Sequence, residues 1–334
     1  MHLNKLGLYP AGSGLLLLSG LMFYSTALHA APSVSYLEAK PGDIIQIKLS
    51  ELHPTQMAVG KLQVAGKLAE YAEDSKELFD ELCDVQGAGK AAKVSDSSTP
   101  QDPSSYTCKQ AIGAKKSDMN TVDIGPTGKL YLTDGHHGFN SFWDAPNGGG
   151  DVTLSIRVEQ NLGHDSNGTA LTQAQFEQKM AELKHFLPID AQGETITFSQ
   201  LPEGLGMSNF QNDPYRSMLY YLRGVSYNKP EKNVNPATGE HYAAVPFLEF
   251  YWGQVLRGKM DLKQYDLSKQ DDYIKALKEA AVVMTTLPET QLIGHSGKTA
   301  AALGQLKSID EKRLDKLAKP DSKLAKALEY QASH

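Results

Sequence analysis

The feature that most constrains the fold is a short apolar segment that runs directly into a polar loop containing glycine. Residues 129–133, with the sequence Lys-Leu-Tyr-Leu-Thr, are typical of a β-strand. The residues that follow are Asp134, Gly135, His136 and His137. Because Gly135 has no side chain, the backbone can turn sharply there. We therefore expect a carboxylate and two imidazoles at the end of this strand.

The polar loop has two interpretations. Asp134 can orient an imidazole or a metal-bound water, while His136 and His137 can donate hydrogen bonds, transfer a proton or bind a metal. A helix that begins just after the loop would add free backbone amides and therefore an anion site. In the alternative interpretation Asp134 caps the next turn and both histidines are ordinary surface residues.

Hydrophobic periodicity predicts further elements on both sides of the loop. Strands are predicted at residues 43–49, 121–124 and 152–158, the last from strict alternation of apolar residues. Helices are predicted at 61–82, from 172, at 213–224, at 246–256 and from 268 onward. We interpret the charged final stretch, residues 309–330, as a peripheral helix or a frayed tail.

The first thirty residues have the order of a secretory signal peptide. Lys5 precedes apolar runs at 15–18 and 21–24, and small residues follow at Ala30 and Ala31. We expect cleavage near one of these alanines, which would leave a soluble protein in the periplasm or outside the cell, because no later segment is apolar enough to span a bilayer. The alternative is an uncleaved membrane anchor, since the residue three positions before the cut is not small.

The charge balance of the chain argues against one class of function. The sequence has 33 basic residues (Lys and Arg) against 39 acidic ones (Asp and Glu), a formal net charge of −6. Removal of the first thirty residues, whose one such charge is Lys5, changes this to −7. Sequence-independent DNA binding relies on a clustered positive surface. The composition therefore weighs against that activity, although it leaves room for a local basic patch.

The chain has two cysteines, Cys83 and Cys108, which lie 25 positions apart. In an oxidising compartment such a pair most simply forms a disulfide. A loop of this length would stabilise the fold by roughly 3 kcal/mol by restricting the unfolded chain. The segment 87–103 between them shows neither helical nor strand periodicity, so we interpret the disulfide as a staple on an insertion. The alternative, a catalytic thiol, has no activating pattern nearby.

Five motifs follow one another between residues 44 and 257. They are Pro54-Thr55-Gln56, the Gly-Pro-x-Gly turn at 125–128, Tyr131-Leu132-Thr133-Asp134-Gly135-His136-His137, Asp213-Pro214-Tyr215-Arg216-Ser217, and a helix with Phe247, Glu249, Phe250 and Trp252. Each motif alone is weak, but five in one order are hard to obtain by chance. In this order they resemble the ParB-like nuclease family, in particular its secreted members.

The resemblance implies an α+β fold with a small mixed-sheet core of the ParB and sulfiredoxin type. Residues 31–260 would form the ParB-like domain, with the disulfide-closed insertion near 83–108, and residues 261–334 would form a helical C-terminal extension. Members of this superfamily hold phosphate or nucleotide at a strand-to-helix loop. The corresponding site would lie at residues 134–138, with a phosphate-containing small molecule or a nucleic acid as its partner.

Two departures from the family pattern affect this implied site. Relatives usually have arginine after the histidine pair, where its guanidinium grips phosphate, whereas this chain has Gly138. Arg216, Arg223 or Arg257 would then have to supply the positive charge from a helix. Sulfiredoxins use a cysteine in the loop, and the lack of one here excludes the reduction of sulfinic acids.

Polar residues outside the loop give weaker signals. Glu249 lies in a largely apolar predicted helix, so it is either paired with an arginine or poised as an acid or base. His164, Asp165 and His185 match no metal-ligand spacing, and we interpret them as scattered surface residues. Residues 294–299 end like a phosphate-binding P-loop, but its first glycine is missing and no strand precedes it.

The sequence as a whole predicts an exported, nuclease-like hydrolase of phosphoesters. His136 or His137 is the expected general acid or base, Asp134 orients it or a divalent metal, and Glu249 is a further acid–base candidate. The predicted ligand-binding residues are Gln56, Gly135, Gly138, Arg216 and Arg257. Two alternatives stay open: a module that binds an anion or nucleotide without turnover, and a small-molecule kinase like the serine kinase of the superfamily.

Overall fold

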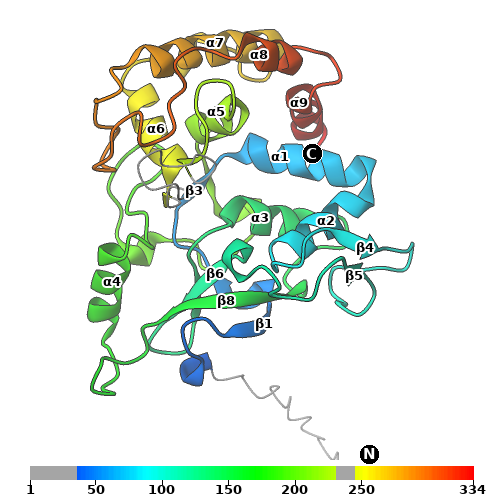
Figure 1. The fold of residues 1–334 in the computed structure, drawn as a ribbon, viewed down its shortest axis with the longest axis vertical. Coiled ribbons are helices and arrows are strands. Elements are labelled where there is room, and N and C mark those ends of the chain that lie inside the picture. Colours follow the sequence, from blue (N-terminus) through cyan, green and yellow to red (C-terminus); the bar gives the residue numbers. More distant parts are fainter. Residues whose placement is uncertain (1–35, 231–244) are drawn as a thin grey trace, which may run out of the picture. The chain divides into compact units, whose positions relative to one another are not determined.

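Five strands form the central sheet of the computed structural model, which describes residues 36–230 and 245–334 (Figure 1). Along the sheet their order is β1 (Ile44–Lys48), β8 (Thr153–Asn161), β6 (Thr121–Ile124), β7 (Leu130–Leu132) and β2 (Leu52–His53). The pairs β1–β8 and β6–β7 are antiparallel, whereas β6–β8 and β2–β7 are parallel. The sheet is therefore mixed, and the strands predicted from the sequence are confirmed.

The two faces of the sheet carry different residues. On one face, alternate residues of β6 and β8 are fully buried against helices in a large apolar cluster; they are Val122, Ile124, Leu154, Ile156 and Val158. On the other face, Tyr131 packs against Phe176 of α4 (Gln173–Glu182) in a smaller aromatic cluster. Asp123 is paired with Tyr131 across β6 and β7, so it lies on this second face.

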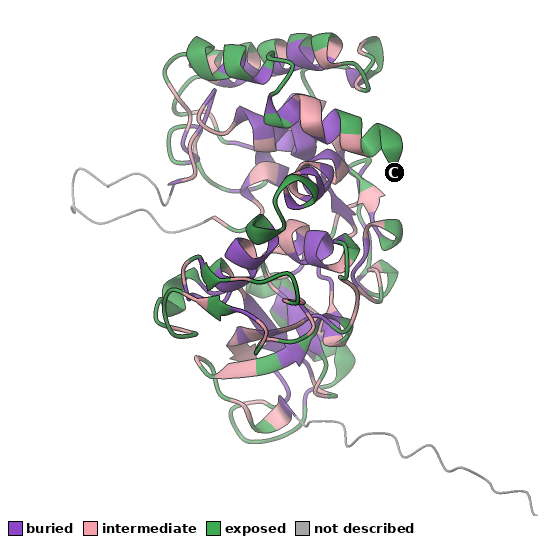
Figure 2. Ribbon diagram, turned by 90° about the vertical axis from the view of Figure 1, so that its right-hand side faces the viewer, coloured by how far each residue is buried: buried purple, intermediate pink, exposed green. Residues whose placement is uncertain are grey.

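Helix α1 (Lys61–Glu73) lies between two hydrophobic clusters. It contributes Val64 and Leu68 to the cluster on the sheet, and Leu62 and Ala65 to a second cluster formed by the C-terminal helices. A helix that is apolar on opposite sides is buried on both, and Figure 2 shows such buried segments through the middle of the molecule. The prediction of one helix across 61–82 was wrong, because the chain is extended at Asp74, which caps α2 (Ser75–Asp84).

The C-terminal helices pack on α1 instead of forming a tail. They are α5 (Pro214–Leu222), α6 (Leu248–Arg257), α7 (Gln270–Thr286), α8 (Glu311–Leu317) and α9 (Lys323–Ser333). Helix α9 crosses over α1 (Figure 1), with Leu324 and Ala327 fully buried. The last stretch is therefore helical, as one of the two interpretations had it, and the alternative of a frayed tail was wrong. Residues 36–334 form one compact unit with helices covering a mixed sheet, which confirms the α+β fold.

The two cysteines form the predicted disulfide, with their Cα atoms 5.6 Å apart. It links the end of α2 to a small antiparallel sheet of β4 (Ala91–Lys93) and β5 (Thr107–Cys108). A second small sheet pairs β3 (Ala58–Val59) with β9 (Gln211–Asn212) in parallel. Short 3-10 helices lie at Tyr36–Glu38, Leu49–Glu51, Lys116–Asp118, Phe198–Gln200, Met207–Asn209 and Leu262–Gln264. The insertion thus contains strand pairing that its sequence periodicity did not reveal.

The predicted signal peptide at residues 1–30 lies outside the described residues. Among residues 36–230 and 245–334, none of the helices combines the length and apolar character needed to cross a membrane.

Candidate functional site

The polar loop forms the junction between β7 and α3 (His136–Asp144), so the anion site that depended on a helix just after the loop has its helix. Gly135 precedes the first turn with a positive φ of 85°. A Cβ atom at this position would lie 2.5 Å from Nδ2 of Asn120, so a larger residue would not fit without movement. The Oδ1 atom of Asp134 accepts a hydrogen bond of 2.7 Å from the amide of Gly135. Strand, turn and helix therefore meet within a few residues.

The two imidazoles hold the segment between β2 and α1 against α3. Nε2 of His136 accepts a hydrogen bond from the amide of Thr55, and Nε2 of His137 accepts one from the amide of Gly60, each at 3.0 Å. Because a backbone amide can only donate, the proton of each ring must be on Nδ1. His136 is 3% exposed, so the interpretation as a surface residue does not apply to it.

Both rings of the loop are kept neutral by their surroundings. Burial, assisted by the positive charge of Arg216, lowers the pKa of His136 to about 3. The same two causes lower the pKa of His137 well below its usual value. The geometry therefore favours hydrogen-bond donation through Nδ1 over proton transfer through Nε2.

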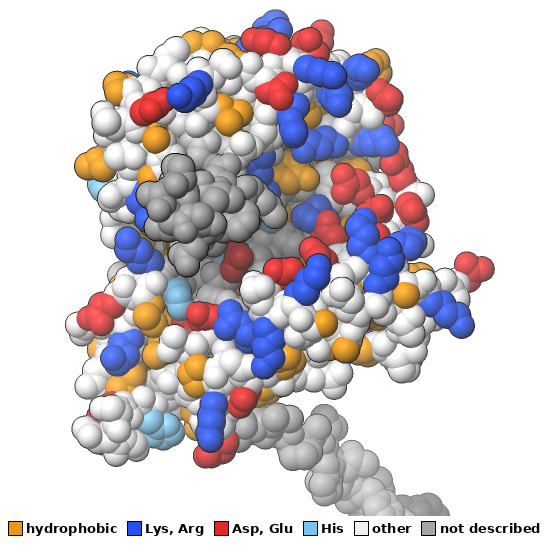
Figure 3. All heavy atoms as spheres, in the orientation of Figure 1, with side chains coloured by type: hydrophobic (Ala, Val, Ile, Leu, Met, Phe, Trp, Pro, Cys, Tyr) orange, Lys and Arg blue, Asp and Glu red, His pale blue; other side chains and the backbone are white. Residues whose placement is uncertain are grey.

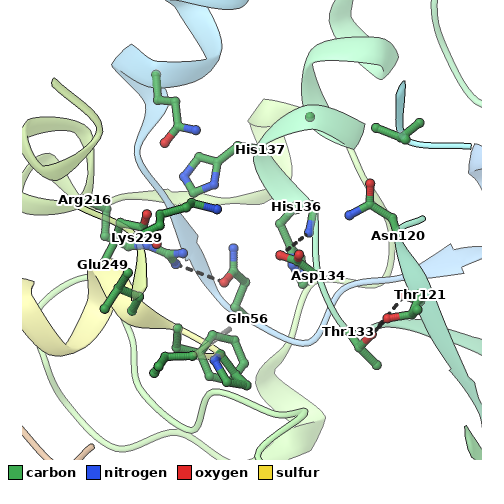
Figure 4. Close-up of a pocket in the computed structure, with 18 of the residues that line it drawn as sticks. Gln56, Asn120, Thr121, Thr133, Asp134, His136, His137, Arg216, Lys229 and Glu249 are labelled. Carbon is green, nitrogen blue, oxygen red and sulfur yellow. Dashed lines mark hydrogen bonds between the residues drawn. The ribbon is translucent and has the colours of Figure 1, made fainter. Parts of the chain in front are cut away.

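The first turn of α3 opens into a cavity of about 580 Å³. Its wall includes Asp134, both loop histidines and Gly138, together with residues from α1, α2, β6, α5 and α6. Figure 4 shows Gln56, His137, Arg216 and Glu249 facing a common space, with Thr121 and Thr133 farther along the wall. On the face drawn in Figure 3 the surface is hollowed, and basic and acidic side chains stand around the hollow.

Arg216 is a buried positive charge in the wall of this cavity. Its side chain is 5% exposed, and Nη1 donates to Oε1 of Gln56 at 3.0 Å and to the carbonyl of Ala58 at 2.9 Å. Nε of Arg216 and Nε2 of Gln56 are buried and have no hydrogen-bond partner in the described part of the chain. No described carboxylate lies within ion-pair distance of this guanidinium. Burial lowers the pKa of Arg216, although the negative charges of Asp213 and Glu249 partly counteract it.

Glu249 lines the cavity but is paired with Arg223. Its Oε1 atom accepts hydrogen bonds from Nε and Nη2 of Arg223 at 3.0 and 2.5 Å. Burial alone would raise the pKa of Glu249, but the Arg223 guanidinium outweighs it and the pKa falls to about 2. The structure thus supports the arginine-paired interpretation of Glu249 and leaves its carboxylate charged, which does not suit a proton donor.

Two other predicted ligand-binding residues occupy very different places. Arg257 does not line the cavity, because its guanidinium contacts Asp213 at 3.1 Å and lies over the ring of Tyr215. Gly138 does line the cavity, and a Cβ atom built there would meet no heavy atom within 4 Å. The space beside Gly138 is therefore open.

His185 is a cavity residue that sequence reasoning placed on the surface. Its ring lines the cavity and its Nδ1 atom lies 2.6 Å from Oδ2 of Asp123. Asp123 is fully buried in β6, between Val122 and Ile124. A carboxylate in the middle of an apolar strand was the available signal, because such a group requires a partner.

Metal binding was left open by the sequence, with Asp134 as an orienting group. In residues 36–230 and 245–334, no set of three or more His, Cys, Asp or Glu side chains is arranged to hold a metal ion.

Comparison with known proteins identifies a family for this chain. Residues 45–258 match the model of the family described as "Putative ParB-like nuclease". None of the curated proteins matches the chain. Among solved structures, it is similar to protein Atu1540 from Agrobacterium tumefaciens, with 22% identity, a TM-score of 0.46, and coverage of 72% of this chain and 90% of that one. Since the family match covers more than half of the sequence, this protein belongs to the ParB-like nuclease family.

Proposed function

We propose that the cavity at the start of α3 binds the phosphoryl group of a phosphoester and supports its hydrolysis. The observation that carries this proposal is the buried guanidinium of Arg216, which has no carboxylate partner among the described residues and faces the same cavity as the first turn of α3. Burial of a charge costs several kcal/mol, and for Arg216 the negative charges of Asp213 and Glu249 offset only part of this cost. A bound phosphoryl group would offset that cost.

The other groups around Arg216 suit the same ligand. The first amides of α3 cannot bond within the helix, and the helix dipole favours an anion beside them. Nε2 of Gln56 adds a donor without a partner among the described residues. Nδ1 of His137 carries the proton, so this ring can also donate. All these groups are donors, as expected for an oxyanion ligand.

Hydrolysis also requires a group that handles the attacking water. Asp134 is exposed just before the first turn of α3 and lines the cavity, so its carboxylate can orient a water molecule and accept its proton. The amides and Arg216 would stabilise the charge that develops on the phosphoryl oxygens. The family membership supports chemistry on phosphate-containing molecules, including nucleic acids.

The phosphate site is tested by placing a negative charge at Gly138. In Gly138→Asp the new carboxylate would point into open cavity space beside the helix amides. We expect at least tenfold weaker binding of inorganic phosphate by calorimetry, without loss of melting temperature. The matched control is Gly204→Asp, because a Cβ at Gly204 also meets no atom within 4 Å and this residue does not line the cavity. Equal phosphate affinity in both variants would contradict the site.

Turnover is tested separately with a panel of nucleic acids and small phosphoesters, with and without added divalent metals. Release of alcohol or nucleotide by the wild type, reduced in Gly138→Asp, would support a hydrolase. Phosphate or nucleotide binding without turnover would instead support the non-catalytic binding module. Consumption of ATP that depends on an added hydroxyl compound would support a kinase.

We also propose that the protein is exported to the periplasm or beyond. The disulfide between Cys83 and Cys108 supports this, because disulfides persist mainly in oxidising compartments. The intact mass of protein recovered from the periplasm should correspond to a chain that begins near Ala31. Recovery of the full-length chain from the cytoplasm, with both thiols free, would contradict export.

A further inference from the structure

A second type of imidazole environment lies on the same cavity, away from the loop. The ring of His185 is held at Nδ1 by the carboxylate of Asp123, and its side chain is 17% exposed while that of Asp123 is fully buried. Nε2 of His185 makes no hydrogen bond with the described residues. A carboxylate that orients one nitrogen of an imidazole leaves the other nitrogen available to a ligand in the cavity.

The charges around this pair favour the protonated ring. Asp123 lies on β6 and Glu159 on β8, and both are negative neighbours of His185. Arg157 pairs with Glu159 at 2.7 Å, which partly neutralises that residue. Burial alone would lower the pKa of His185, but the hydrogen bond that its Nδ1 donates to Asp123 outweighs it and the pKa is raised. A buried carboxylate also requires a compensating positive charge, which the imidazolium supplies.

The loop histidines are poorly suited to donate a proton in catalysis. Their Nε2 atoms are occupied by the amides of Thr55 and Gly60, and both rings are neutral. Glu249 is held as an anion by Arg223. His185 is therefore the cavity residue best arranged to donate a proton.

We propose that His185 is the general acid of this cavity and that Asp123 is its positioning residue. This inference rests on the proposed hydrolysis of a phosphoester. A water oxygen attacks phosphorus while the bond from phosphorus to the leaving oxygen breaks, and its electron pair stays on that oxygen. His185 gives the Nε2 proton to the leaving oxygen, which departs as an alcohol. Asp134 accepts the proton of the attacking water, and exchange with solvent restores both groups.

The general-acid role is tested with two substrates that differ in the leaving group. An alcohol such as the nucleoside released from thymidylyl-thymidine needs a proton, whereas p-nitrophenolate released from bis(p-nitrophenyl) phosphate does not. In His185→Gln we expect kcat for the dinucleotide to fall by at least about 100-fold, the lower end of the usual general-acid contribution. The loss for the activated diester should stay within about threefold, and phosphate affinity within about twofold.

The matched control is His164→Gln, which changes the same residue type at an exposed position outside the cavity. Both rates should be unchanged in this variant. A dinucleotide rate in His185→Gln within threefold of the wild type would overturn the assignment. Equal losses with both substrates would also overturn it, because they would indicate a role in structure or binding. If the wild type binds phosphate but cleaves neither substrate, the general-acid role of His185 is overturned, whereas the proposed phosphate site is still supported.

The positioning role of Asp123 has its own readout. Activity requires the protonated ring, so it should fall as pH rises through the pKa of His185. In Asp123→Asn that alkaline limb should move to lower pH, because the negative charge that raises the pKa is lost. An unchanged pH profile in a folded Asp123→Asn protein would overturn this role. If this variant does not fold, the substrate comparison with His185→Gln still decides the proposal. Loss of phosphate binding in the wild type would remove both proposals together.

Discussion

The loop at the start of α3 and the segment after α4 each present histidine to one cavity, but in different environments. At the loop, the Nε2 atoms of His136 and His137 accept hydrogen bonds from backbone amides, and the rings are neutral. At β6, a buried carboxylate holds Nδ1 of His185 and raises its pKa. The side chain is the same in both places, so burial, nearby charges and the hydrogen-bond partner decide its chemistry. An amide partner makes histidine a fixed structural acceptor, and a carboxylate makes it a proton donor.

The largest expected effect is on the free energy of unfolding and tests the structural role of the loop histidines. His136→Ala removes the acceptor for the amide of Thr55, which is fully buried. An unsatisfied buried donor and a new cavity together should lower the free energy of unfolding by about 3 kcal/mol. Urea denaturation at neutral pH measures this. The exposed control His164→Ala should stay within about 0.5 kcal/mol of the wild type. A similarly small loss in His136→Ala would mean that this ring does not hold the loop.

A smaller effect concerns how the contribution of His136 to the free energy of unfolding depends on pH. Because the folded pKa of His136 is depressed to about 3, the stability it supports is present above about pH 6.5 and is lost as pH falls from there toward 3. We expect the advantage of the wild type over His136→Gln, which has no titrating ring, to shrink by about 2 kcal/mol between pH 7 and pH 5. Denaturation of both proteins at the two pH values checks this. A constant difference would show that the ring is not held neutral.

The smallest effect compares the two environments directly by NMR. The ring protons of His185, assigned with His185→Gln, should titrate above the usual pKa of histidine in the wild type. Those of His136 should not shift between pH 8 and pH 5. Asp123→Asn should lower the His185 midpoint, because the negative charge beside the ring is lost. A wild-type midpoint for His185 below that of a free imidazole would break the comparison.

Much of the site could be predicted because its parts are close in sequence or carry their own signal. The strand, Gly135 and the helix after it are consecutive, and their turn follows from local backbone geometry. Arg216 was identified as a candidate for the missing charge, and it does line the cavity. Arg257 was an equally plausible candidate, but in the structure it pairs with Asp213. Sequence alone could not rank these two, because the ranking depends on which way each helix faces.

The dyad of Asp123 and His185 was missed for a related reason. Its members are 62 residues apart, and His185 lies just beyond α4, which ends at Glu182. A similar limit applied to α9, whose Lys-rich, Ala-rich sequence gave no sign that Leu324 and Ala327 would be buried against α1. In both cases the partner lies far away in sequence, and its identity depends on packing.

The sequence by itself determined the family, the order of strands and helices, the cysteine pair and the loop that begins α3, because each depends on neighbouring residues or on a motif order. The tertiary structure alone decided which histidines have a lowered pKa and which one has a raised pKa, and which arginines reach the cavity. The physical reason is that burial and the nearest hydrogen-bond partner set the charge of a side chain. Those partners come together only when distant segments pack.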